Sequence, residues 1–160
     1  MSDRAIIGID PGANGGLAYL SDEHLEVFKC PKNAEAMGTL INRCISNSEI
    51  GGYTLSAVIE EVWARPMNSV RSSFTFGVNY GKWLGILGHS FIPRIKVIPQ
   101  TWMSEYQPLP RNYTERKNSL LSIAEELSHD YEIKVTKQTA DAILIAFWGM
   151  NNHNIKTEEE

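Results

Sequence analysis

The sequence predicts an α/β fold with a central five-stranded mixed sheet and helices on both faces. Two observations lead to this prediction. Three short strand patterns follow one another near the start of the chain with turn residues between them, which is typical of antiparallel hairpins. Strand and helix patterns then alternate, which is typical of parallel strands joined by crossover helices. The sheet is therefore expected to be antiparallel at its start and parallel later.

The strand patterns are short apolar runs, rich in β-branched residues, that end at glycine, proline or polar residues. Pro11, Gly12 and Gly15 separate the first two runs and favour a tight turn between them. Strands are expected over residues 5–10, 15–20, 25–29, 55–62 and 94–98.

The helix patterns repeat apolar residues at every third or fourth position. In the first of them, Met37, Leu40, Ile41 and Cys44 share one face, and the polar stretch 47–54 that follows is expected to be a loop. Helices are expected over residues 33–45, 69–87, 101–106, 114–127 and 138–150.

The chain has 160 residues, of which 42% are hydrophobic, and this is enough for one domain with a substantial core. We expect that domain over residues 1–152 and a disordered acidic tail over 153–160. No stretch approaches the roughly 20 apolar residues of a membrane span, so no membrane partner is expected. The isolated Cys30 and Cys44 are typical of a reducing compartment, so a cytoplasmic location is predicted.

The net charge of −4 does not by itself favour a nucleic-acid partner. Without the three glutamates at positions 158–160 the charge is −1. If metal ions also covered three acidic side chains, the remaining charge would be mildly positive. The composition therefore allows DNA binding without predicting it.

Three carboxylates stand at the ends of predicted elements that are far apart in the sequence. Asp10 ends the first strand, Glu60 lies near the end of the fourth, and Asp141 lies in the first turn of the last helix. Glu61 is an alternative to Glu60, because strand alternation lets only one of them face a common site. Such carboxylates on separate elements predict metal-dependent phosphodiester chemistry.

At these positions the chain resembles the RuvC-like Holliday junction resolvases, particularly the small phage-type members of the ribonuclease H-like superfamily. The likeness depends on Gly8-Ile9-Asp10-Pro11-Gly12, on Ile59-Glu60-Glu61-Val62-Trp63, and on Ala140-Asp141-Ala142 continuing into an apolar helix. The order of elements agrees from about residue 5 to 150. The resemblance implies a ribonuclease H-like fold and a homodimer that binds a four-way DNA junction and nicks two opposed strands symmetrically. A phage-encoded protein of this kind would act in the host cytoplasm.

The resemblance also implies a catalytic site with two Mg²⁺ ions about 4 Å apart, which Mn²⁺ could replace, and no nucleotide cofactor. It assigns Asp10 as the bridging ligand and Glu60 and Asp141 as the other carboxylate ligands. Many relatives carry an Asp, and some a His, where this chain has Gln138. An amide oxygen can coordinate Mg²⁺ but adds no charge, so one ion should bind more weakly.

Contacts to DNA are expected from one aromatic and several basic residues. Trp63 lies three residues after Glu60, where resolvases of this type often place an aromatic that stacks on opened bases; a buried core Trp is the alternative. The basic residues expected to bind phosphates are Arg65, Arg71, Arg111, Arg116, Lys117 and Lys137.

Gly77, Gly81 and Gly85 follow one another at four-residue spacing in the second predicted helix. Each glycine costs about 1 kcal/mol in a helix, so a row of three indicates close approach of another backbone. That backbone could belong to the same helix of a second subunit or to the sheet of the same chain.

Other functions remain possible at this point. Among enzymes, the second interpretation is an RNA-processing nuclease of the same superfamily, or a branched-DNA nuclease with little junction selectivity. A catalytically impaired module that binds branched DNA is a further alternative, because Gln138 replaces an acid. An actin-like ATP-binding domain also begins with a strand, an Asp and a glycine-rich hairpin, but it needs a second such hairpin and a longer chain.

Overall fold

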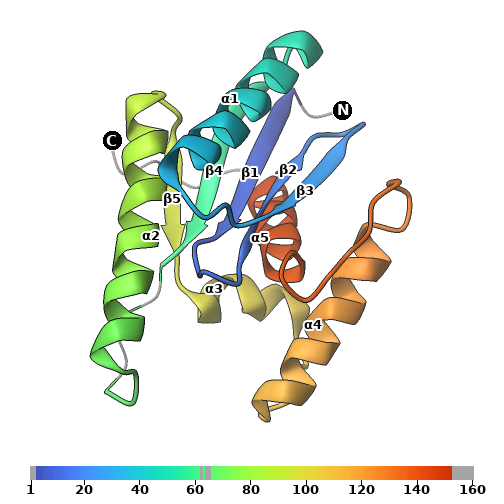
Figure 1. Ribbon diagram of the computed structural model, residues 1–160. Coiled ribbons are helices and arrows are strands. Elements are labelled where there is room, and N and C mark those ends of the chain that lie inside the picture. The colour runs from blue at the N-terminus through green and yellow to red at the C-terminus, as the bar shows by residue number, and fades with distance from the viewer. Residues whose placement is uncertain (1–2, 62, 64–65, 153–160) are drawn as a thin grey trace.

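The structure, a computed structural model, describes residues 3–61, 63 and 66–152. It contains one five-stranded sheet in the order β3-β2-β1-β4-β5 (Figure 1). The strands are β1 (Arg4–Asp10), β2 (Gly16–Leu20), β3 (Leu25–Lys29), β4 (Thr54–Glu60) and β5 (Arg94–Val97). The expected acidic tail over residues 153–160 and the expected phosphate contact Arg65 lie outside the described residues.

The pairing of the strands confirms the predicted mixed sheet. β1 is antiparallel to β2, which is antiparallel to β3, so the first three strands form a meander. β1 is parallel to β4, and β4 is parallel to β5, because helices connect these strands. The central strand β1 is buried from Ala5 to Ile9. Asp10 is the last residue of this strand, so it lies in the middle of the row of strand ends on one side of the sheet.

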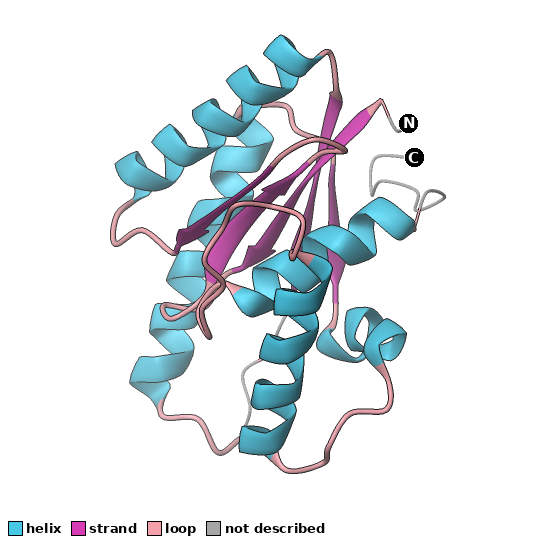
Figure 2. Cartoon of the chain, turned by 90° about the vertical axis from the view of Figure 1, so that its right-hand side faces the viewer, coloured by secondary structure: helices cyan, strands magenta, loops and turns pink. Residues whose placement is uncertain are grey.

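Helices cover both faces of the sheet, as predicted (Figure 2). Alternate residues of β1 face opposite sides, so Ile7 and Ile9 pack with one set of helices while Ile6 packs with the other. The first set is α1 (Ala34–Gly51) and α2 (Val70–His89). The second set is α3 (Pro99–Met103), α4 (Tyr113–Leu127) and α5 (Ala140–Asn151), with the 3₁₀ helix η1 (Ser104–Tyr106) after α3. None of the helices in the described part of the chain could span a bilayer.

The predicted end of the first helix at residue 45 and the predicted loop over residues 47–54 are wrong. α1 continues to Gly51, and Gly52 ends it in the left-handed conformation with a φ of 71°. Ser48 extends the buried face of this helix, and its hydroxyl donates a hydrogen bond of 3.2 Å to the Tyr19 hydroxyl. The polar composition of this stretch concealed a helical turn whose buried residue is a serine.

Smaller differences concern the ends of three other elements. The last helix begins at Ala140 rather than at residue 138, so Gln138 lies in the turn before it. The short helix predicted over residues 101–106 begins earlier, at Pro99, because proline suits the first turn of a helix. β4 ends at Glu60 rather than at residue 62, so the acid is the last residue of its strand.

Candidate active site

Asp10 and Glu60 are neighbours because two parallel strands end at the same edge of the sheet. Ile9 of β1 pairs with Ile59 of β4, and the acids directly follow this pair. The third acid comes from α5, which packs directly on β1. A Cβ atom on Gly8 would lie 2.3 Å from the carbonyl oxygen of Ala142, so only glycine permits this approach.

The turn after β1 holds the Asp10 side chain in place. The backbone N–H of Gly12 donates a hydrogen bond of 3.2 Å to the Asp10 Oδ1 atom. A Cβ atom on Gly15 would lie 2.7 Å from the Asp10 carboxyl carbon, so the returning chain can pass here only as glycine. The glycines that suggested a turn in the sequence therefore also make room for the carboxylate.

The acids lie in a cleft of about 720 Å³ at this end of the sheet. Figure 1 shows the N-terminal halves of α2 and α4 extending past the end of the sheet, and residues from both lie in the walls of the cleft. The predicted site residues that line it are Asp10, Glu60, Asp141, Gln138, Arg116, Lys117 and Lys137. The fold therefore brings together the three predicted acids, the amide that replaces a fourth, and three of the predicted basic residues.

The acids strongly disfavour one another's negative charge. Burial, together with repulsion from Asp141, raises the pKa of Asp10 to about 6. Burial and repulsion from Asp10 raise the pKa of Glu60 to about 8, although the Trp102 indole opposes this by donating a hydrogen bond to the carboxylate. A cluster of this kind needs a cation nearby to be fully ionised at neutral pH.

One such cation belongs to the chain itself. The Lys117 ammonium of α4 forms a hydrogen-bonded ion pair with the Asp141 Oδ2 atom. Burial opposes the charge of Lys117, but Asp141 and Asp10 outweigh burial and raise the pKa of this lysine. The other carboxylate oxygen, Asp141 Oδ1, is buried and has no hydrogen-bond partner among the residues that the structure describes.

The donor atoms of this cleft fit a hard divalent cation such as Mg²⁺, which prefers oxygen ligands. Three carboxylates and the Gln138 amide supply oxygens, and the Asp141 Oδ1 atom is a buried acceptor with no partner in the described part of the chain. Within the described ranges, no three His, Cys, Asp or Glu side chains are close enough together to hold one ion. Ions shared between pairs of these carboxylates are consistent with that spacing.

The raised pKa values predict how the stability of the metal-free protein depends on pH. A carboxyl whose pKa is higher in the folded than in the unfolded state binds protons more tightly when folded. The free energy of unfolding should therefore fall as the pH rises from about 4.5, the ordinary pKa of a glutamate, to about 8, the pKa of Glu60 in the folded protein. Urea unfolding in EDTA at a series of pH values measures this decline.

The matched control for this measurement is the double variant Asp10→Asn, Glu60→Gln, which lacks both titrating groups. Its stability should decline less than that of the wild type over the same pH range. Equal slopes for the two proteins would show that these two carboxyls do not cause the pH dependence.

The other predicted DNA contacts that the structure describes lie outside the cleft. Trp63 is 70% exposed just after β4, which excludes the alternative of a core Trp. Arg71 and Arg111 are exposed but do not line the cleft. Glu61, the alternative to Glu60, is half-buried and does not line the cleft either.

The glycine row of α2 does not contact the sheet of its own chain, so that alternative is wrong. A Cβ atom on Gly77, Gly81 or Gly85 would meet no atom within 4 Å, and all three glycines are exposed. Val70 and Phe74, at 88% and 73% exposure, stand on the same side of α2 at helical spacing. The row and these apolar side chains form one exposed stripe along the helix.

Several cleft residues were not identified from the sequence. Phe76 of α2 lies in one wall, and Tyr113 of α4 lies in the other, where the Arg116 guanidinium sits 5.8 Å from the centre of its ring. The sequence also did not identify Trp102, which lies behind the cleft and donates a hydrogen bond to Glu60. The four-residue spacing of Tyr113 and Lys117 was the one sequence signal that these α4 residues share a face.

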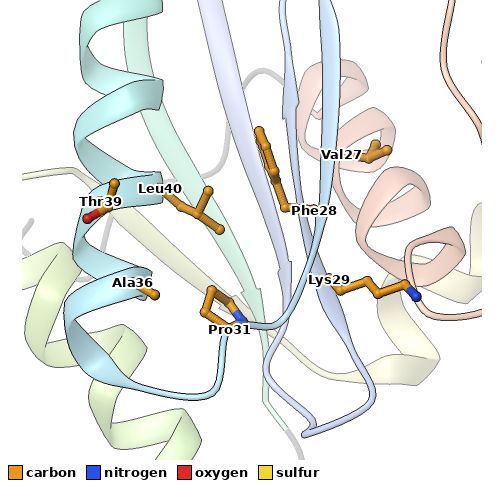
Figure 3. A pocket seen from close by; sticks show the side chains of 7 residues that line it. All are labelled: Val27, Phe28, Lys29, Pro31, Ala36, Thr39 and Leu40. Atoms are coloured by element: carbon orange, nitrogen blue, oxygen red, sulfur yellow. The ribbon is translucent and has the colours of Figure 1, made fainter.

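A second, apolar groove of about 600 Å³ lies between β3 and α1. Figure 3 shows Phe28, Pro31 and Leu40 between the strand and the helix, while Val27 and Lys29 point to the other side of the strand. The residues that line this groove include no carboxylate. This groove therefore supplies no acid for the chemistry expected of the chain.

Comparisons with known proteins agree with this architecture. No protein-family model and no curated protein sequence matches the chain. Among solved structures, T. thermophilus RuvC in complex with a Holliday junction substrate matches with a TM-score of 0.63 and 17% sequence identity, over 96% of this chain and 99% of that one. A second Thermus thermophilus RuvC structure matches with a TM-score of 0.58 and 20% identity, over 90% of this chain and 92% of that one. The chain therefore has the ribonuclease H-like fold of RuvC.

Proposed function

We propose that this protein is a Mg²⁺-dependent endonuclease that resolves Holliday junctions and other branched DNA. The main support is the cleft, where three acids and a half-buried lysine meet at the end of the central strands. The fold adds support, because it is shared with a RuvC whose structure contains a Holliday junction substrate.

In this proposal Asp10, Glu60 and Asp141 hold two metal ions, and Gln138 contributes a weak ligand. When bound, such ions supply an activated water and stabilise the leaving 3′ oxygen. Arg116 and Lys137 lie in the cleft with the acids and bind backbone phosphates on either side of the cut. Lys117, already beside Asp141, neutralises charge in the cleft as a phosphate enters.

DNA outside the cleft is held by residues that the sequence singled out. Trp63 is exposed and stacks on a base opened at the junction crossover. Phosphates of the junction arms are contacted by Arg65, Arg71 and Arg111. Trp63, Arg71 and Arg111 do not line the cleft, so they contribute to binding rather than to hydrolysis.

We further propose a homodimer in which two copies of α2 meet along the glycine row. The exposed stripe supports this interface, since small residues allow close helix packing and the apolar side chains beside them would be buried. A dimer would present two clefts to a two-fold symmetric junction and so allow symmetric nicking.

The test of this function is cleavage of labelled DNA by the purified protein. We expect nicks in opposed strands of a four-way junction with Mg²⁺ or Mn²⁺, no cleavage in EDTA, and much slower cleavage of linear duplex. Preferential cleavage of an RNA hairpin would favour an RNA-processing nuclease. Junction binding without cleavage under any metal condition would identify a binding module.

The dimer interface predicts the effect of a single substitution. Gly81→Leu should produce monomers, because a leucine would separate the facing backbones by the width of a side chain. Such monomers should fold but should no longer nick both junction strands in concert. Light scattering and a supercoiled cruciform assay, which separates single from paired nicks, measure the two effects.

Gly38→Leu is the matched control, because Gly38 is a helical glycine of α1 whose Cβ would also meet no atom within 4 Å. It should remain dimeric. A wild-type protein that is monomeric at micromolar concentration with and without DNA would contradict the proposed interface.

A further inference from the structure

The Glu60 carboxylate accepts a buried hydrogen bond from a residue 42 positions away. The Trp102 indole N–H donates a hydrogen bond of 2.7 Å to Glu60 Oε2. Trp102 has no exposed surface and Glu60 is only 8% exposed. Because an indole has one donor and no acceptor, this contact fixes one carboxylate oxygen and leaves Oε1 for the cleft.

Trp102 reaches Glu60 because α3 is attached to the neighbouring strand. Glu60 pairs with Val97 at the end of β5, and the Glu61 backbone N–H donates a hydrogen bond of 2.8 Å to the Val97 carbonyl. Pro99 then starts α3 two residues after the strand ends. Figure 1 shows α3 at the lower end of the sheet. The helix therefore returns the indole to the strand that carries the acid.

A second aromatic residue connects Trp102 to the helix that carries the third acid. The Tyr106 ring meets the Trp102 ring edge-on, with centroids 6.2 Å apart and an angle of 64°. The Tyr106 hydroxyl donates a hydrogen bond of 2.7 Å to the Leu144 carbonyl in α5. Leu144 lies three residues after Asp141, so it belongs to the next turn of the same helix.

From these contacts we infer that Trp102 and Tyr106 form an aromatic brace that fixes the Glu60 carboxylate relative to Asp141 before any metal binds. The brace runs from Glu60 through the two rings to the backbone of α5. Trp102 and Tyr106 are positioning residues, since neither lines the cleft. The inference rests on the proposed function only in that the acids bind a divalent cation.

The mutual repulsion of the acids explains why a brace is needed. Asp10 and Asp141 both oppose the charge on Glu60, so an unrestrained glutamate would turn away from them. Because the folded protein already holds the carboxylate in place, metal binding does not have to reorient it. The Trp102 donor also favours the ionised form of Glu60, which is the form that binds a cation.

The test is metal binding without DNA, measured by calorimetric titration of the folded protein with Mn²⁺. Trp102→Phe keeps an aromatic ring but removes the donor, and Tyr106→Phe removes only the hydroxyl. We expect Trp102→Phe to weaken binding about tenfold, the lower end of what loss of a residue supporting a metal ligand causes, and Tyr106→Phe to weaken it less. Because both residues act through one chain of contacts, the double variant should bind little worse than Trp102→Phe alone.

Trp83→Phe is the matched control. Trp83 is equally buried, and its indole lies beside the Cys30 thiol rather than beside a carboxylate, so it supports no acid. Its substitution should lower thermal stability without changing the affinity for Mn²⁺. In NMR spectra, addition of diamagnetic Mg²⁺ should shift the Trp102 indole proton and leave that of Trp83 unchanged.

Wild-type affinity in a well-folded Trp102→Phe variant would overturn the brace, as would equal weakening by Trp83→Phe. A wild-type protein that binds no divalent cation would also overturn it. If Trp102→Phe weakens metal binding while the wild type cleaves no branched DNA, the brace stands and the proposed nuclease function fails. The two proposals are therefore tested separately.

Discussion

Replacing any one of the three acids by its amide should abolish Mg²⁺-dependent junction cleavage while junction binding survives. We expect Asp10→Asn, Glu60→Gln and Asp141→Asn each to lower the cleavage rate by roughly a thousandfold, equivalent to about 4 kcal/mol of barrier. Binding should persist or become tighter, because each substitution removes a negative charge that repels phosphate. Cleavage assays and mobility shifts with a labelled four-way junction measure the two quantities.

Glu61→Gln is the control for these substitutions, because Glu61 neighbours Glu60 but does not line the cleft. It should cleave at nearly the wild-type rate. An inactive Glu61→Gln beside an active Glu60→Gln would reverse the assignment of the second ligand. Loss of both binding and the circular dichroism signal in all three amide variants would mean that the acids stabilise the fold instead.

Removing the Lys117 ammonium should destabilise the protein most strongly when metal is absent. Lys117→Met keeps the aliphatic stem but leaves the buried Asp141 carboxylate with no ion-pair partner. We expect a loss of about 2 kcal/mol in the free energy of unfolding in EDTA. Mg²⁺ should stabilise this variant more than the wild type, because the metal no longer competes with an internal cation. Urea unfolding with EDTA and with Mg²⁺ measures both changes.

Lys137→Met is the comparison for Lys117→Met. Lys137 lines the same cleft but is exposed and forms no ion pair within the described part of the chain. Its substitution should leave stability unchanged in both conditions and should weaken only DNA binding. Equal losses of stability in the two lysine variants would show that the ion pair with Asp141 is not what stabilises the metal-free fold.

The fold could be predicted because its strands are short apolar runs bounded by turn residues and most of its helices repeat apolar residues at every third or fourth position. The three acids could be placed together for a related reason: Asp10 and Glu60 end strands, and parallel neighbours end at one edge. The end of α1 was missed because a serine, Ser48, takes the place of an apolar residue on its buried face. Sequence patterns report the usual residue for a position, so a buried serine is not recognised.

The contacts around the acids could not be predicted for a different reason. Lys117 and Asp141 are 24 residues apart, and Trp102 and Glu60 are 42 apart, so no local pattern connects either pair. Lys117 was assigned to DNA because its charge alone fits phosphate as well as it fits a carboxylate. The packing of α4 against α5 brings Lys117 to Asp141, and the position of α3 next to the end of β4 brings Trp102 to Glu60.

The contact between Gly8 and α5 has a consequence for how such a protein can change over evolutionary time. The backbone of β1 at Gly8 packs directly against the backbone of α5, with no side chain between them. This contact determines where Asp141 lies relative to Asp10. Substitutions elsewhere in the chain can accumulate without moving these two acids, whereas any residue larger than glycine at position 8 would push α5 and Asp141 away from β1. Position 8 is therefore constrained by the geometry of a cleft that it does not line.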